Sequence, residues 1–468
     1  MLSGMSVHTP LGATSHSAGV ELSGAPALRT RAASRGWQGP TALAGLLVFG
    51  GLIAIAAAHT TPLLPESIRP AQPVGLAGTF DALGLDIHAG GAMAALMLMA
   101  GSYTVVVLCA RQLSGRMVLG AIAALYAVIL FAPVLISTDI FSYQAYSRMG
   151  AVYGVNPYLN GPHGIALDPL SQYIGVKWSY IPSVYGPIFT ALSYVLSPLS
   201  IVASVVTYKL VAALSALAIV AMVWNLARRR GVDPVRAAAL VGLNPLLALY
   251  GVGGGHNDLL MLVPVVGAVY ATELGRERLS GGLAIVGIGI KLTAGLVLPF
   301  AIAAGGPLRD RSRRRELLTA AALGGVLLAG FGVAVFGPGV FSMFAAVQHS
   351  QSVGDWHSLS GLIVTLGLST VGHIFGYLLT IAFLVVTVRL LRRVWHGQMD
   401  WIDGAGWATL AMLVTANSLL PWYVAWLLPL AALSTDRRLL RWTLILTCFV
   451  QFTQLPSYFP HGASLIGY

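Results

Sequence analysis

A series of apolar runs, most of them long enough to cross the hydrocarbon core of a bilayer, constrains the fold of this chain more than any other feature. Of the 468 residues, 56% are hydrophobic and 9% are charged, and the mean hydropathy is +0.78. These values exclude a water-soluble domain. We predict an all-helical, polytopic membrane protein whose apolar runs fall near 41–58, 89–109, 117–136, 205–227, 237–252, 257–272, 281–304, 317–338, 371–391, 404–419, 421–434 and 440–456.

The basic residues stand where orientation in a membrane requires them. A net charge of +11 could indicate nucleic-acid binding. The arginines, however, form short clusters between apolar runs, as the positive-inside rule expects of the cytoplasmic loops of a membrane protein. With a cytoplasmic N-terminus, the later arginine clusters also fall on the cytoplasmic side only if two segments are not single spans. Residues 188–204 form an interfacial or re-entrant helix, and residues 281–304 form two short helices. The prediction is a multi-pass cell-membrane protein of about thirteen spans, with an external C-terminus.

The same reading divides the chain into two parts. Residues 1–38 are rich in Ser, Gly, Ala and Thr and predict a disordered cytoplasmic tail. Residues 39–468 form a single polytopic domain, in which 137–204 is a long external loop. Cys109 and Cys448 lie in apolar segments, so we expect free thiols and no disulfide. No internal repeat is visible.

The longest polar interruption begins at Ser137, and we interpret it as the active-site loop of a membrane enzyme. A helix that starts here has Asp139 in its first turn, with Tyr143 and Tyr146 on the same face. Arg148 is about half a turn out of phase and is not expected to neutralise that acid. An acid at the membrane boundary without a local partner is a candidate general base. The alternative is a carboxylate that only favours the helix dipole.

Aromatic and amide side chains in the rest of this loop could bind sugar. Trp and Tyr offer flat faces that pack against sugar rings, although the same residues also form interfacial belts. His163, Asp168 and Lys177 are more often simply solvated. The candidates for sugar binding in the loop are Tyr143, Tyr146, Asn156, Tyr158, Trp178 and Tyr185.

Two further stretches could hold an anion. Three glycines precede His256, Asn257 and Asp258, and they allow exposed N–H groups in a tight turn. His256 could bind a phosphate or a sugar hydroxyl, whereas Asp258 is read as a helix cap. Lys291 lies in an apolar run, where a lysine needs a polar partner, a lipid phosphate or access to the interface.

Late in the chain, an aromatic turn contains Trp422 and Tyr423, which could line the same cavity or anchor the helices. His349 and the stretch 355–357 contain histidines and an acid. Their spacing gives no compact ligand set, so we predict no bound metal.

Taken together, S-T-D-I-F-S-Y, Y-G-V-N-P-Y, Y-G-P, G-G-H-N-D and P-W-Y-V-A-W resemble motifs of the GT-C class of membrane glycosyltransferases. The pattern is most similar to the polyprenol-phosphate-mannose-dependent α-1,6-mannosyltransferases of lipomannan biosynthesis, over residues 117–434. The resemblance implies a lipid-linked donor, a glycolipid or oligomannoside acceptor and a catalytic acid that matches Asp139. Because two spans precede this loop, Asp81 and Asp86 stay open as alternatives for the acid.

A mechanism follows from the chemistry of such a donor. Asp139 would deprotonate an acceptor hydroxyl that attacks the anomeric carbon with inversion, and Arg148, His256 or Lys291 would stabilise the departing phosphate. Asn257, Trp422 and Tyr423 join the loop residues as candidates for sugar binding. No cofactor and no nucleic acid are expected. The alternatives are a GT-C enzyme with another polyprenyl-phosphate sugar, or a flippase for a polyprenyl-linked lipid.

Overall fold

The computed structural model describes residues 36–60, 63–64, 75–306, 311–352 and 358–453. Every regular element within these ranges is a helix, which confirms the all-α prediction for the described part of the chain. Nearly all of the predicted tail, residues 1–38, lies outside these ranges. Cys109 and Cys448 are free thiols, as expected.

Each predicted apolar run corresponds to a helix or to a broken pair of helices. Five are long and apolar enough to cross a membrane: α1 (Gln38–Ala56), α2 (Ala89–Leu108), α7 (Ile201–Arg229), α12 (Arg311–Phe336) and α15 (Ser369–Trp395). A sixth span results if α8 (Pro234–Gly242) and η6 (Leu246–Val252), which meet at 47°, form one bent segment. The described residues thus support five or six spans, and the predicted number of about thirteen is not confirmed.

Shorter helices fill the space between these spans. They are α3 (Gly115–Phe131), α4 (Asp139–Ala151), α5 (Val176–Ser179), α6 (Pro187–Tyr194), α9 (Asn257–Glu273), α10 (Glu277–Ile290), α11 (Val297–Ala303), α13 (Met343–Ser352), α14 (Leu359–Thr365), α16 (Trp401–Thr415), α17 (Leu428–Leu433) and α18 (Arg437–Phe452).

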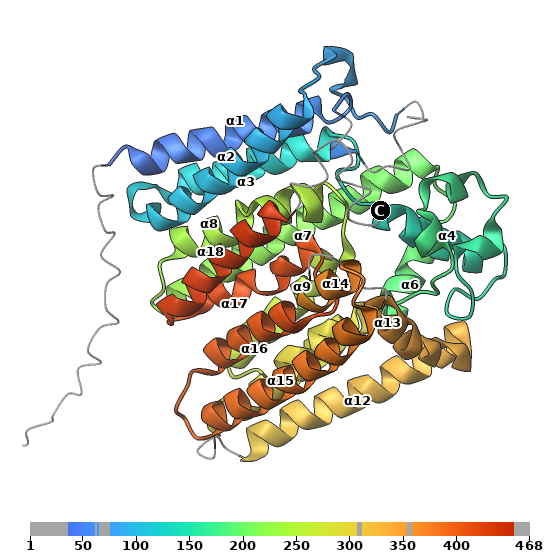
Figure 1. Ribbon diagram of the computed structural model, residues 1–468. Helices are drawn as coiled ribbons and strands as arrows, with labels where there is room; N and C mark the ends of the chain where they lie inside the picture. The colour runs from blue at the N-terminus through green and yellow to red at the C-terminus, as the bar shows by residue number, and fades with distance from the viewer. Residues whose placement is uncertain (1–35, 61–62, 65–74, 307–310, 353–357, 454–468) are drawn as a thin grey trace, which may run out of the picture.

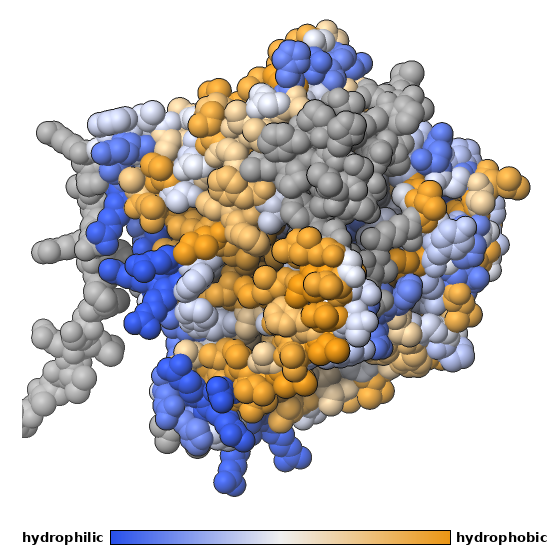
Figure 2. Space-filling model, viewed as in Figure 1, coloured by the Kyte–Doolittle hydropathy of each residue, from blue (hydrophilic) through white to orange (hydrophobic). Residues whose placement is uncertain are grey.

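The long helices lie roughly side by side in layers (Figure 1). Helices α1, α2 and α3 form one outer layer, and α12, α15 and α16 lie on the opposite flank, with α7, α8, α9, α17 and α18 between them. Helices α4 and α6 lie together at one end of the long helices. Figure 2 shows a broad apolar band across one flank and hydrophilic side chains gathered toward its edges, as expected for a protein that faces lipid.

The run at 281–304 is interrupted, as predicted. Helix α10 ends at Ile290, Lys291 adopts extended backbone (φ −153°, ψ 130°), and the 3-10 turn η7 (Leu292–Leu296) leads into α11. The break packs against the start of α6, where Gly186 N–H donates to the Ile290 carbonyl at 2.9 Å. A Cβ at Gly186 would collide with the backbone of Gly289, so this close approach requires glycine. Residues 188–204 contain the short helix α6 and the start of α7.

An ion-pair network ties the helices together at the end opposite α4. Arg230 follows α7, and its guanidinium contacts Glu273 at 2.7 Å and Asp400 at 2.8 Å. It also donates to the Leu433 carbonyl at 3.1 Å, and Trp401 Nε1 donates to Glu273 at 2.8 Å. The ends of α7, α9 and α17 are therefore joined to the start of α16.

Removing this guanidinium should loosen the bundle. We expect Arg230→Met to lower the free energy of unfolding by about 2 kcal/mol, because Glu273 and Asp400 lose a partly buried partner. Arg278→Met is the matched control, since Arg278 is 77% exposed and its partner Glu316 is 44% exposed. The control should change stability by less than about 0.5 kcal/mol. Thermal unfolding of the full chain in detergent measures both, and equal effects would contradict a special role for Arg230.

Candidate active site

Four separate segments meet at one end of the helix bundle. Chain direction explains this arrangement, because α9 begins at that end, α10 returns to it, and α16 ends there before η10 (Pro421–Trp426). Helix α4 starts beside them. The site is therefore built from the start of α4, the start of α9, the break after α10 and the aromatic turn η10.

A strained turn leads into α4. Ile136 has φ = +60° and is the one non-glycine residue with positive φ in the described chain, a costly conformation for a β-branched residue. Hydrogen bonds hold it there, from Ile136 N–H to the Leu63 carbonyl (3.1 Å) and from Ser137 N–H to the Leu135 carbonyl (2.7 Å). Ser137 Oγ accepts from Asp139 N–H at 3.3 Å. Helix α4 therefore begins at Asp139, as the sequence predicts.

A buried lysine also holds the connection between α3 and α4. Lys209 of α7 is 1% exposed, and its ammonium donates to the Pro133 carbonyl at 3.1 Å and to the Ala132 carbonyl. These carbonyls follow the end of α3, where a positive charge is favourable. Lys209 is not among the residues predicted from the sequence, although a lysine in the run V-V-T-Y-K-L-V-A-A-L is as anomalous as Lys291.

Asp139 lies beside a buried histidine. Asp139 Oδ2 is 3.6 Å from His256 Nδ1, and the carboxylate remains 25% exposed while the imidazole is fully buried. The same Nδ1 is 3.4 Å from the Tyr143 hydroxyl, which donates to Asn257 Oδ1 at 3.3 Å. Because a phenol has one proton, Nδ1 is then the donor to Tyr143, and Nε2 of a neutral ring carries a free lone pair. No hydrogen-bond partner of His256 Nε2 is found among the described residues.

Burial, together with the nearby charges, shifts the pKa values of both groups. Burial raises the pKa of Asp139 to about 7, with Lys291 lowering it and Asp258 raising it. Burial and the nearby Lys291 charge hold the pKa of His256 well below its usual value. The site thus combines a carboxylate that can take up a proton near neutral pH with an uncharged imidazole.

Lys291 finds its polar partner in Asp258. Its ammonium is 2.8 and 3.0 Å from the two carboxylate oxygens, and Trp426 Nε1 donates to the same carboxylate at 2.6 Å. The Lys291 ammonium also lies over the rings of Tyr423 (5.0 Å) and Trp426 (5.3 Å). Asp258 was expected to be only a helix cap, but it is buried and serves as the counter-ion of this lysine.

The aromatic turn separates two sides of the site. Trp422 stacks on His256 with ring centroids 3.9 Å apart, whereas Tyr423 stacks on Trp426 beside Lys291. The buried Nε1 of Trp422 and Nδ2 of Asn257 have no hydrogen-bond partner among the described residues. Buried donors without a partner in the protein are commonly satisfied by ordered water or by a bound ligand.

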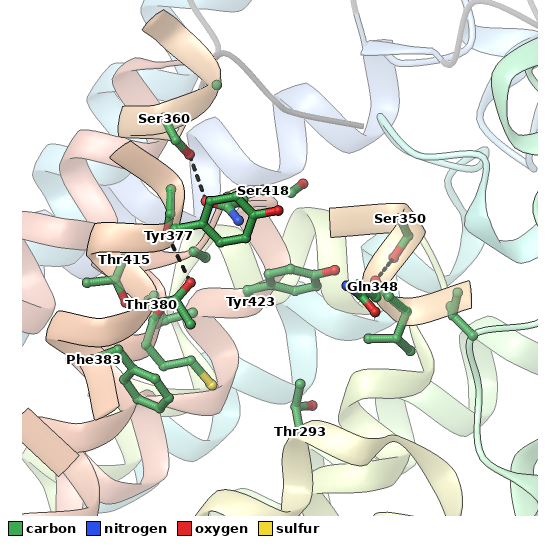
Figure 3. Close-up of a pocket in the computed structure, with 18 of the residues that line it drawn as sticks. Thr293, Gln348, Ser350, Ser360, Tyr377, Thr380, Phe383, Thr415, Ser418 and Tyr423 are labelled. Atoms are coloured by element: carbon green, nitrogen blue, oxygen red, sulfur yellow. Dashed lines mark hydrogen bonds between the residues drawn. The ribbon is translucent and has the colours of Figure 1, made fainter. Parts of the chain in front are cut away.

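A cavity of about 530 Å³ adjoins Lys291. Residues of η7, α13, α14, α15, α16 and η10 surround it, and Figure 3 shows Thr293, Gln348, Tyr377 and Tyr423 around one shared space. Its wall is mixed, with hydroxyl groups near η10 and Phe383 deeper along α15. The cavity can hold an amphipathic ligand that carries a polar group next to Lys291.

Other predicted residues lie in the scaffold of the loop. Arg148 is paired with the buried Asp168 at 2.7 Å, and Tyr153 donates to the same carboxylate. Burial raises the pKa of Asp168, but hydrogen bonds from Leu170, Tyr153 and Arg148 outweigh it and hold that pKa below its usual value. The sequence expectation that Arg148 does not neutralise Asp139 is confirmed, whereas the expectation of a solvated Asp168 is wrong.

Several tyrosines and Asn156 are also engaged by the protein itself. Tyr146 donates to the Ile181 carbonyl at 2.8 Å, and Tyr158 donates to the Tyr185 carbonyl at 3.0 Å. Asn156 donates to the Phe336 carbonyl at 2.7 Å. Trp178 is partly buried against the core. Of the predicted sugar-binding residues, the structure brings Tyr143, Tyr185, Asn257, Trp422 and Tyr423 together around His256 and Lys291.

The alternative acids lie elsewhere. Asp81 is exposed and sits 3.2 Å from His59, and Asp86 is exposed as well. Residues 355–357 lie outside the described ranges. In the part of the chain that the structure describes, no three His, Cys, Asp or Glu side chains come together as a group that could hold a metal ion. The absence of a metal stays a prediction.

Comparison with known proteins decides the family. The profile described as "Alpha-(1->6)-mannopyranosyltransferase, N-terminal domain" matches residues 37–305, which is more than half of the chain. The chain belongs to this family. A second profile, described as "MptB C-terminal domain", matches residues 350–465. The resemblance that the sequence motifs indicate is confirmed.

Individual mannopyranosyltransferases of the family align over much of the chain. "Alpha-(1->6)-mannopyranosyltransferase A" of Mycobacterium tuberculosis is 30% identical over 338 residues, covering 65% of this chain and 64% of the relative. "Alpha-(1->6)-mannopyranosyltransferase B" of Corynebacterium glutamicum is 27% identical over 346 residues, covering 65% of this chain and 56% of the relative. The chain thus aligns with less than two thirds of the length of either relative. No solved structure matches it significantly.

Loss of the buried lysine should disturb the entry to α4. We expect Lys209→Met to lower the unfolding free energy by about 1–3 kcal/mol, because the Ala132 and Pro133 carbonyls lose their donor in a buried place. Thr207→Val on the same helix is the control, since the Thr207 hydroxyl donates to the Ala203 carbonyl within its own helix. Thermal unfolding in detergent measures both, and an unchanged midpoint for Lys209→Met would contradict the anchoring role.

Proposed function

We propose that this chain transfers a mannosyl residue from polyprenyl-phosphate mannose to a mannan-type lipoglycan acceptor, forming an α-1,6 linkage on the external face of the membrane. The family and the names of its relatives support mannosyl transfer. One observation carries the proposal for this chain. Asp139, a carboxylate whose pKa burial raises to about 7, lies within electrostatic reach of the partly buried Lys291–Asp258 pair, and Lys291 lines the cavity.

In this proposal Asp139 is the general base. It removes the proton of an acceptor hydroxyl while the oxygen attacks the anomeric carbon of the donor. The bond from that carbon to the phosphate oxygen breaks at the same time, with inversion, and polyprenyl phosphate leaves with the electron pair. Because a phosphate leaves without being protonated, one carboxylate suffices, whereas glycosidases use two.

Lys291 is the group we assign to the departing phosphate. An ammonium has three N–H donors, and Asp258 engages it from one side only, so a donor remains for a phosphate oxygen in the cavity. Arg148 suits this role less well, because Asp168 already holds its guanidinium. His256, a neutral ring with a free Nε2, would accept a hydrogen bond from a sugar hydroxyl rather than neutralise a phosphate.

Replacing the base should strongly slow transfer without disturbing the fold. We expect Asp139→Asn to lower the rate of mannosyl transfer by about 10²–10⁴-fold, the range usual for a lost general base. The assay uses purified full-length protein, labelled polyprenyl-phosphate mannose and a short α-1,6 mannoside. Asp81→Asn is the matched control and should keep full activity. Full activity of Asp139→Asn would exclude Asp139 as the base, and lipid translocation without transfer would favour a flippase.

The rate should also report the ionisation of Asp139. A general base works only when it is ionised, so kcat/KM should rise with pH and level off above about 7, the pKa of Asp139. Because Lys291 lowers that pKa, Lys291→Met should move this limb of the profile to higher pH, in addition to lowering the rate. A limb that stays in place in Lys291→Met, or that lies near the pKa of an ordinary carboxylate at about 4, would contradict the assignment.

A further inference from the structure

A second hollow lies far from the candidate active site. It is an open groove of about 370 Å³ between α11 and the last turns of α15. Helix α15 begins at the end of the bundle where α14 leads into it, and it runs to the Arg230 network, where Asp400 follows it. The groove is therefore near the end opposite Asp139.

The walls of the groove are almost entirely apolar. Pro299, Ile302 and Ala303 of α11 face Val388 and Leu391 of α15. Val388 is 48% exposed, and only 11% of the apolar window of α15 is buried inside the protein. In a bilayer, such a surface is covered by acyl chains.

Among the described residues that line the groove, the charged one is Arg392. Arg392 lines the groove directly and Arg389 stands one turn before it, and both are exposed. No ion pair of either residue is found in the part of the chain that the structure describes. In Figure 2, hydrophilic side chains gather at the lower edge of the molecule. Figure 1, in the same view, shows the end of α15 and the start of α12 there.

A tryptophan closes the groove at the level of these charges. Trp395 lines it, and the guanidinium of Arg314 lies 4.3 Å from the centre of the indole ring. Arg314 is itself held by the carbonyls of Ile302 (3.3 Å) and Gly306. Tryptophan with arginine is typical of the interfacial level of a bilayer, where lipid headgroups lie. The groove thus joins a place for an acyl chain to a place for a negative headgroup.

We propose that this groove binds an anionic phospholipid. One acyl chain lies between Ile302 and Val388, and the headgroup phosphate binds Arg392 and Arg389. Charge complementarity selects this occupant over a zwitterionic lipid, because each exposed arginine attracts a net negative headgroup. The site is distinct from the candidate donor site at Lys291, so it does not depend on the proposed function.

Lipid binding to the full chain in detergent tests this site. The probes are phosphatidylglycerol and phosphatidylcholine, and the readout is lipid retained per protein in native mass spectrometry. We expect the wild type to prefer phosphatidylglycerol by about fivefold or more, as one to two arginine contacts imply. Arg389→Gln combined with Arg392→Gln should remove most of this preference, and Val388→Trp should reduce retention of both lipids.

Arg441→Gln is the control, because Arg441 is an exposed arginine on α18. It should keep the preference for phosphatidylglycerol. An equal loss in Arg441→Gln would show a general attraction by surface charge and overturn the site. The proposal also fails if the double variant retains the full preference, or if Val388→Trp leaves retention of both lipids unchanged.

Discussion

The ion pair between Lys291 and Asp258 is the interaction on which the polar end of this molecule depends. Two charges in an apolar bundle are stable only when each has close partners. Asp258 receives the ammonium and the Trp426 indole N–H, and the ammonium also faces the Tyr423 ring. These contacts require α10 to end at Ile290 so that Lys291 can turn toward α9. This partly buried pair therefore joins the helix break, the aromatic turn and one wall of the cavity.

Asp139 is held independently of that pair, through contacts of the backbone that connects α3 to α4. The connection from α3 to α4 contains the strained Ile136, and it is fastened by Lys209 on one side and by the Gly253 carbonyl, which accepts from Leu135 N–H at 3.3 Å, on the other. Asp139 consequently faces His256 from a connection that has little freedom. Such pre-organisation is what a site needs when its groups act on charge that develops during the reaction. The opposite end, with Arg230 and the exposed arginines of α15, serves stability and contact with lipid.

The helices, the break in 281–304 and the gathering of Asp139, His256 and Lys291 at one end of the bundle could be predicted from the sequence, because they depend on local pattern and on the cost of charge in an apolar run. That Asp258 is the partner of Lys291 could not be predicted, because 33 residues and a helix reversal separate the two. The same limit explains Arg148, whose partner Asp168 lies in a loop without periodicity. Lys209 could have been found by the argument applied to Lys291. The predicted number of about thirteen spans is not confirmed, because several of the apolar runs form short or broken helices in the described residues.

A structure of the protein with a bound polyprenyl phosphate sugar tests the central claim most directly. We expect the phosphate within hydrogen-bond reach of the Lys291 ammonium, at about 3 Å, with the prenyl chain in the cavity beside α15 and the anomeric carbon turned toward Asp139. A phosphate bound at Arg148, or a sugar out of reach of Asp139, would contradict this claim.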